Sequence, residues 1–247
     1  MDELSGRAPA EARQRWRIVF RRDPDTSEDA HPETVEAWAT ALSGAGLPIA
    51  YSQGKAPRPR IALALPLPVG MAGEAELVDV ALTERLTQPA VRARLAGHLP
   101  AADRLVDLFD VWLGEPTFAS RLAAADYRLE VHPATSAEIA RACAGLLAKA
   151  SLPRSRPKGD GRVVEYDLRP LLMGLAVADG KDRAMGSGGS DALVRLRLVV
   201  AQDAASGRPD EVVLALGDEL DRPLMVKETV RERLLTVDDL ATMGERG

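Results

Sequence analysis

The chain has 247 residues and a formal net charge of −5, so it is long enough for one large domain or two small ones. Hydrophobic residues make up 46% and aromatic residues only 4%, which predicts a globular core of Leu, Val, Ala and Ile. The acidic balance argues against a strongly basic protein that coats nucleic acid. Cys143 is the single cysteine, so the chain cannot supply a disulfide, a Cys-rich zinc site or the ligands of an iron–sulfur cluster.

The N-terminal residues 1–12 are polar and contain no apolar signal segment. We expect them to be a disordered lead-in. No stretch of about eighteen residues is continuously apolar. We therefore expect a cytoplasmic protein with no membrane partner.

The first half of the chain predicts the order strand, helix, strands, helix, strand. Residues 13–22 alternate, with apolar residues on one face and Arg15, Arg17 and Arg21 on the other, which predicts a half-buried strand with solvated arginines. A helix begins at His31-Pro32 and buries the stripe Val35, Trp38, Ala39 and Leu42. A second helix begins near Thr87 and Pro89. Further strands are expected at residues 47–52, 60–67, 76–83 and 105–113.

After a link at residues 114–124 the pattern restarts with a strand at 127–131. Thr135 and Glu138 form a capping box before a helix with a buried stripe that contains Cys143. Lys158-Gly-Asp-Gly161 predicts a hairpin turn before a strand at 162–168. The remaining expected elements are a strand at 194–200 with Arg195 and Arg197 facing outward, a helix at 209–216 ended by Gly217, and a strand at 224–235 that could also be read as a helix.

The Gly-Ser run at residues 185–190 indicates a disordered insertion, with a substrate lid as the less favoured alternative. The two successive patterns predict an α+β protein of two consecutive ferredoxin-like βαββαβ halves with antiparallel sheets. The halves are expected at residues 13–120 and 121–247. Because the halves share no visible sequence similarity, this is a repeat of pattern only.

The candidate binding site is the loop at residues 51–60. Tyr51, Ser52 and Gln53 supply a phenol, a hydroxyl and an amide beside Gly54, which can adopt a positive φ. The cations that follow are Lys55, Arg58 and Arg60, with Pro57 and Pro59 stiffening the chain between them. A rigid basic loop suits a phosphate, a carboxylate or a nucleic-acid backbone, whereas a structural connection with solvated cations is the alternative.

Acidic residues follow this loop, and Glu74, Glu76 and Asp79 complete the surface that we expect to contact a ligand or partner. No motif identifies a catalytic centre, since the sequence contains no phosphate-binding glycine loop, nucleophile elbow or His-Glu-x-x-His pair. His31, His98 and His132 lie at expected element boundaries, which is typical of caps or surface residues. We therefore predict neither catalytic residues nor a metal site.

Residues 46–54, 57–61, 64–70 and 74–79 resemble the signature of the radical SAM-linked proteins, a bacterial family of unknown function. Looser similarity at residues 167–170 and 208–212 extends the resemblance over most of the chain. The resemblance implies that the chain accompanies a cobalamin-binding radical SAM protein. That partner would carry the iron–sulfur cluster, S-adenosylmethionine and cobalamin, and no cofactor is expected in this chain.

The chain departs from the family pattern at two places. Members usually carry a Ser-His-Leu-Asp-type segment where this chain has Ala30-His-Pro-Glu33, which puts a functional role of His31 in doubt. The position after Ser-Gln-Gly is often aromatic in the family, and here it is Lys55.

Three functions follow from these patterns. The leading hypothesis is a non-catalytic partner or substrate-presenting subunit of a cobalamin-dependent radical SAM enzyme, with RNA modification as a candidate process. The alternative is a stand-alone RNA-binding module that uses the loop at 51–60 together with Arg15 and Arg17. The third is an independent enzyme with Tyr51, Ser52 or His31 as acid or base, which ranks last because nothing nearby orients a base.

Overall fold

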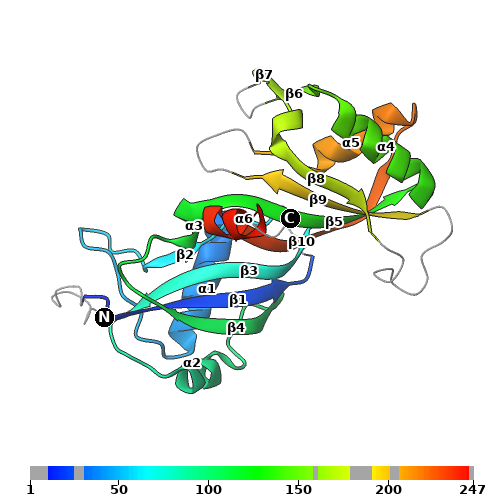
Figure 1. The fold of residues 1–247 in the computed structure, drawn as a ribbon. Coiled ribbons are helices and arrows are strands. Elements are labelled where there is room, and N and C mark those ends of the chain that lie inside the picture. Colours follow the sequence, from blue (N-terminus) through cyan, green and yellow to red (C-terminus); the bar gives the residue numbers. More distant parts are fainter. Residues whose placement is uncertain (1–10, 25–30, 158–160, 179–190, 201–205, 245–247) are drawn as a thin grey trace. The chain divides into compact units, whose positions relative to one another are not determined.

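The computed structural model describes residues 11–24, 31–157, 161–178, 191–200 and 206–244 (Figure 1). The chain is a mixed α+β protein with antiparallel strand pairing, as the sequence predicts. It divides into unit 1, residues 1–121, and unit 2, residues 122–247. None of the described helices is long and apolar enough to cross a membrane.

Unit 1 is built on four antiparallel strands. Its elements are β1 (Gln14–Arg22), α1 (His31–Gly44), β2 (Ile61–Leu63), β3 (Ala72–Leu82), α2 (Gln88–Leu95), β4 (Asp103–Val111) and α3 (Phe118–Arg121). β1 pairs with both β3 and β4, and β2 pairs with β3. The strand order within unit 1 is therefore β4-β1-β3-β2.

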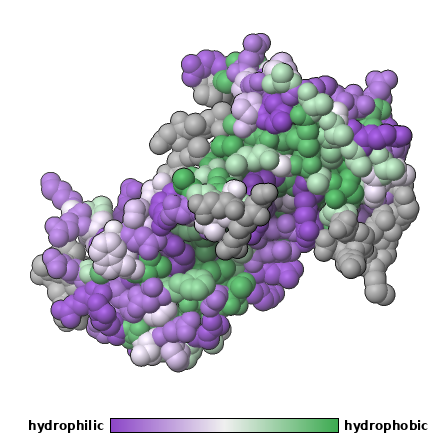
Figure 2. All heavy atoms as spheres, viewed as in Figure 1, coloured by the Kyte–Doolittle hydropathy of each residue, from purple (hydrophilic) through white to green (hydrophobic). Residues whose placement is uncertain are grey.

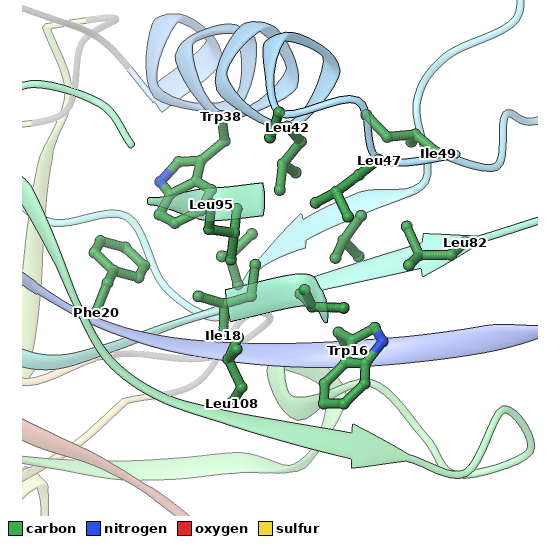
Figure 3. Close-up of a cluster of buried hydrophobic side chains, with 14 residues drawn as sticks. Trp16, Ile18, Phe20, Trp38, Leu42, Leu47, Ile49, Leu82, Leu95 and Leu108 are labelled. Atoms are coloured by element: carbon green, nitrogen blue, oxygen red, sulfur yellow. The ribbon is translucent and has the colours of Figure 1, made fainter. Parts of the chain in front are cut away.

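One face of this sheet packs against the helices and forms the core of unit 1 (Figure 3). Trp16, Ile18 and Phe20 of β1 are each at most 3% exposed, as the alternation predicts. Trp38 of α1 is fully buried, and its ring centroid lies 4.9 Å from that of Phe20. Leu95 of α2 is also fully buried. The apolar stripes of both helices thus cover the same sheet face.

Two predicted strands of unit 1 are wrong in extent. In residues 47–52 only Ile49 and Tyr51 make isolated bridges, because the chain leaves the sheet to form the loop at 51–60. The strand expected at 60–67 is limited to β2, since Pro66 and Pro68 cannot donate backbone hydrogen bonds. The link expected after β4 contains the short helix α3.

Unit 2 repeats the strand order of unit 1. Its elements are β5 (Leu122–His132), α4 (Ser136–Ala148), β6 (Pro153–Pro157), β7 (Val163–Asp167), η1 (Arg169–Leu171), β8 (Leu172–Val177), β9 (Ala192–Val199), α5 (Pro209–Glu219), β10 (Met225–Thr236) and α6 (Val237–Gly244). Its main sheet has the order β10-β5-β9-β8, and every pairing is antiparallel. If β5, β8, β9 and β10 are counted as strands one to four, this order matches that of unit 1. β6 and β7 form a separate two-stranded sheet.

Helix α4 contacts β8, β9 and α5, and α5 contacts β10, so both helices cover one face of the unit 2 sheet. The predicted capping box at the start of α4 is confirmed: Thr135 Oγ1 accepts a hydrogen bond from the Glu138 backbone N–H, and the Glu138 carboxylate accepts one from the Thr135 N–H. The buried stripe of α4, including Cys143, is confirmed as well.

Two expectations for unit 2 need correction, and one helix was missed. The strand expected at 162–168 is β7, which pairs only with β6 in the separate hairpin. The position beside β9 in the main sheet is taken by β8 instead. Gly217 lies inside α5 and does not end it; an added Cβ there would lie 2.9 Å from the carbonyl oxygen of Arg222, so glycine permits a close approach of the returning chain. Helix α6 was not expected. The lead-in residues 1–10, the turn at 158–160 and the Gly-Ser run at 185–190 lie outside the described residues.

Candidate functional site

The loop at residues 51–60 is an exposed turn with an ordered base. The backbone N–H of Arg60 donates to the Ala50 carbonyl at 2.8 Å, and that of Ser52 donates to the Arg58 carbonyl at 2.8 Å. Ser52 Oγ accepts a further hydrogen bond from the Arg58 N–H at 2.9 Å. Gly54 at the tip has a φ of 129°, which favours glycine. The loop is therefore closed by its own backbone and by Ser52.

The side chains of this loop point into solvent. Tyr51 is 42% exposed, and Gln53, Lys55, Arg58 and Arg60 are exposed as well. Among the ion pairs of the described residues, none includes Lys55, Arg58 or Arg60. The three cations therefore lie exposed on one short loop, and the fold leaves their charges available to a ligand.

The acidic residues expected to complete the loop surface do not do so, although Asp79 lies opposite Ala62, close to the end of the loop. Asp79 is 5% exposed and bonded to Arg17 on the neighbouring strand. Glu74 is exposed at the beginning of β3, whereas the loop attaches near the other end of that strand, where the Ala81 N–H donates to the Arg60 carbonyl. Glu74 and Ala81 are seven positions apart along the strand, or roughly 23 Å. Glu76 is buried at 3% exposure.

The predicted solvated arginines of β1 are largely buried, so that prediction is wrong for two of the three. The Arg15 side chain donates to the carbonyl oxygens of Trp112 at 2.9 Å and Glu115 at 2.7 Å. The Arg17 guanidinium binds both carboxylate oxygens of Asp79, at 2.8 and 3.0 Å, and lies 5.1 Å from the centroid of the Phe118 ring. Burial lowers the pKa of Arg17, but the hydrogen bond and charge of Asp79 outweigh burial and raise it.

These contacts hold residues 112–118 over the outer face of the unit 1 sheet. Both arginines are therefore engaged by the protein and do not form an open basic surface for RNA. Of the three arginines, only Arg21 is exposed.

A second charged cluster, which the sequence analysis missed, lies on the outer face of the unit 2 sheet. All of its members except Arg128 line an open groove of about 540 Å³ between residues of β5, β8, β9 and β10. Asp126 accepts hydrogen bonds from Arg197 and Arg233, and Glu232 accepts them from Arg128 and Arg195. Burial raises the pKa of Asp126, but the two arginines outweigh burial and lower it, so the carboxylate stays ionised. The only signal in the sequence was the outward alternation of Arg195 and Arg197.

The other titratable side chains show no catalytic arrangement. Cys143 is 4% exposed, and burial raises the pKa of its thiol to about 11, which is typical of a structural cysteine. His98 Nδ1 lies 3.2 Å from the Ala96 carbonyl oxygen, in the role of a local cap, and the side chain of His31 is outside the description. Within the described ranges, no three His, Cys, Asp or Glu side chains are grouped to hold a metal ion.

Solved structures offer distant likenesses. The chain is similar, at 13% identity and a TM-score of 0.48, to a chain in a crystal structure of a Cbf5–Nop10–Gar1 complex, covering 92% of this chain and 54% of that one. It is similar, at 11% identity and a TM-score of 0.45, to a chain of the archaeal box H/ACA sRNP Nop10–Cbf5 complex, covering 89% and 47%. This chain thus spans about half the length of those chains.

No curated protein matches the chain in sequence. A family model for an uncharacterised protein conserved in bacteria, DUF2344, matches residues 15–209. Its description does not mention radical SAM proteins, so that partnership stays a prediction. Because the match extends over residues 15–209, well over half of the chain, the chain belongs to this bacterial family of uncharacterised proteins.

Proposed function

We propose that the chain is a non-catalytic partner or substrate-presenting subunit of a cobalamin-dependent radical SAM enzyme, and that the loop at residues 51–60 contacts that enzyme. The observation that carries the proposal is the exposure of Lys55, Arg58 and Arg60 on an ordered loop without ion-pair partners in the described part of the chain. These three exposed cations lie within the stretch that resembles the radical SAM-linked signature.

The chemistry of such an enzyme would reside in the partner. A radical SAM cluster is held by cysteine thiolates, and the single cysteine here is buried in α4. The partner would supply the cluster, S-adenosylmethionine and cobalamin. In this proposal the chain contributes binding and positioning.

We also propose that each unit is a ferredoxin-like module. In both units a helix follows the first strand and another follows the third, and the strand order is four-one-three-two. This arrangement of two split βαβ elements supports the proposal. In unit 2 the hairpin of β6 and β7 is then an insertion between α4 and the second strand.

RNA binding through the same loop is the second candidate function. Three exposed cations beside the half-exposed phenol of Tyr51 favour it, because phosphates pair with cations and bases stack on aromatic rings. The two candidates use the same residues, so one experiment separates them.

The experiment is affinity purification of the tagged full chain from its native cytoplasm at low salt, with bound protein and RNA both identified. The test variant is Arg58→Ala with Arg60→Ala. The matched control is Arg85→Ala with Arg141→Ala, which removes two exposed arginines elsewhere. We expect a cobalamin-type radical SAM protein to bind the wild type and the control and to be lost from the loop variant. Recovery of a defined RNA and no such protein would overturn the proposal in favour of RNA binding.

A further inference from the structure

The outer face of the unit 2 sheet carries charged side chains in two rows that cross the strands. In the first row, Asp126 of β5 lies opposite Arg197 of β9 and opposite Arg233 of β10. In the second row, Arg195 of β9 lies opposite Arg128 of β5. Side chains directly opposite each other on neighbouring strands project from the same face, so the register gathers these residues in one place.

The first row is a carboxylate held between two guanidinium groups. Arg197 Nε and Nη2 donate to the two Asp126 oxygens at 2.6 and 3.0 Å, and Arg233 Nε donates to Oδ2 at 2.7 Å. Within the described residues, this leaves Nη1 of Arg197 and both Nη atoms of Arg233 without a hydrogen-bond acceptor. Asp126 therefore fixes the orientation of two arginines while neutralising only one of them.

The second row is built in a similar way. Glu232 accepts hydrogen bonds from Arg128 Nε at 3.1 Å and from Arg195 Nη2 at 3.5 Å. One carboxylate again stands between two guanidinium groups. The groove itself is lined by three arginines, Arg195, Arg197 and Arg233, and two carboxylates, Asp126 and Glu232, so its charged lining has one more cation than anion.

The groove beside these rows has the size of a small-molecule site. Its volume of about 540 Å³ lies within the usual range for small-ligand sites. Apolar residues of β8 form its other side: Met173 is 47% exposed, and Gly174 lies opposite Arg197. Tyr127 is the aromatic residue among the described lining residues and is 4% exposed, so nucleobases would find little stacking surface there.

We propose that this groove binds a small molecule through a phosphate or carboxylate group, which accepts hydrogen bonds from Arg197 and Arg233 while its apolar part packs on Met173. Arginine suits this role because its planar fork of donors matches both anions and Asp126 already orients it. The proposal does not depend on a radical SAM partner or on the loop at 51–60, which belongs to unit 1.

Unit 1 offers an internal comparison. Its sheet carries the equivalent ion pair of Arg17 with Asp79, whose side chains are 14% and 6% exposed beneath Glu115 and Phe118. The pair of Arg197 with Asp126 is 27% and 13% exposed and faces the groove. The ion pair is thus about twice as exposed in unit 2 as in unit 1.

The test is isothermal titration calorimetry of the full chain at low salt, with inorganic phosphate and malonate as probes. Arg233→Gln removes one unsatisfied guanidinium, and we expect it to weaken binding by about tenfold or more. Arg92→Gln is the matched control, since Arg92 is 46% exposed and pairs with Asp107 in unit 1. Saturable binding that only Arg233→Gln weakens supports the proposal, and the probe that binds more tightly identifies the anionic group. No saturable binding to the wild type by about 10 mM, or equal binding to Arg233→Gln, overturns it.

A second pair of variants guards against loss of folding in Arg233→Gln. Ala176 is exposed on β8 and lies opposite Arg195. Ala176→Glu adds a negative charge to the groove and is expected to abolish anion binding, whereas Ala176→Gln adds the same volume without charge and is expected to retain it. Equal binding by the two variants would contradict an electrostatic site.

Discussion

Replacing Arg22 by methionine tests how unit 1 depends on a buried ion pair. Arg22 Nε and Nη2 donate to the two oxygens of Asp103, each at 2.6 Å, and the Asp103 side chain is fully buried. The carboxylate of Glu76 lies near enough to raise the pKa of Asp103 through its charge. Methionine keeps much of the aliphatic volume of Arg22 but leaves Asp103 without its cation. Removing one partner of a buried pair typically costs about 3–5 kcal/mol, and we expect a loss of that size at pH 7.

The loss should depend on pH in a defined direction. Burial raises the pKa of Asp103 in the wild type, and the hydrogen bonds and charge of Arg22 offset only part of that effect. Without Arg22 the folded-state pKa rises further above its unfolded value. A group with a raised folded pKa binds its proton more tightly in the native state, so its stabilising contribution is present at low pH and is lost as pH rises through the folded pKa. The loss of unfolding free energy in Arg22→Met, relative to the wild type, should therefore become smaller as pH falls from 7 towards about 4.

Tryptophan fluorescence during urea denaturation is the appropriate assay, because all three tryptophans belong to unit 1: Trp16, Trp38 and Trp112. The control is Arg104→Met, since Arg104 is 64% exposed and its pair with Asp23 should contribute less than about 1 kcal/mol. Two results would refute the reasoning. One is a loss of unfolding free energy in Arg22→Met below about 1 kcal/mol at pH 7, and the other is a loss of the same size at pH 5 and pH 7.

The remaining predictions concern the two units separately. Thr135→Ala should destabilise unit 2 by about 1 kcal/mol in circular-dichroism melts, because it removes the N-cap of α4. Hydrogen bonds from the Thr135 backbone and side chain lower the pKa of Glu138 to about 2. The ionised carboxylate therefore stabilises the fold above its ordinary pKa, and this stabilisation should be lost as pH falls towards 2, which an NMR-monitored titration would follow. Cys143 should resist a disulfide reagent at pH 8 until urea unfolds unit 2, since burial raises its pKa to about 11. Arg58→Ala with Arg60→Ala should change the free energy of unfolding by less than about 0.5 kcal/mol, because both side chains are exposed; a larger loss in the same urea assay would make the loop structural.

Local pattern predicted most elements whose apolar residues recur at a regular period. The stripe on α1 and the capping box of α4 both carry their signals within a few residues, which is why they could be read directly. β8 was missed because Leu172–Val177 contains no polar residue to alternate with its apolar ones. β6 was missed because prolines stand at both of its ends.

The charged sites were harder to predict because strand register determines them. The loop at 51–60 could be recognised, since its cations are neighbours in sequence and remain neighbours in space. Asp126, Arg197 and Arg233 are separated by up to 107 positions and meet only when β9 and β10 pair with β5. Asp79 was assigned to the loop surface for the same reason, because its partner Arg17 is 62 positions away.

The two ion pairs occupy equivalent positions with their charges exchanged. In unit 1 the arginine is on the first strand and the aspartate on the third, as Arg17 and Asp79. In unit 2 the aspartate is on the first strand and the arginine on the third, as Asp126 and Arg197. In both arrangements the arginine donates to both carboxylate oxygens of the aspartate, but the donors left over differ. A central arginine uses its donors on Asp79 and on the segment above it, whereas a central aspartate can hold an arginine on each side and leave their outer donors free. The exchange of charge between the units thus explains why the donors proposed to bind an anion lie in unit 2 and not on Arg17.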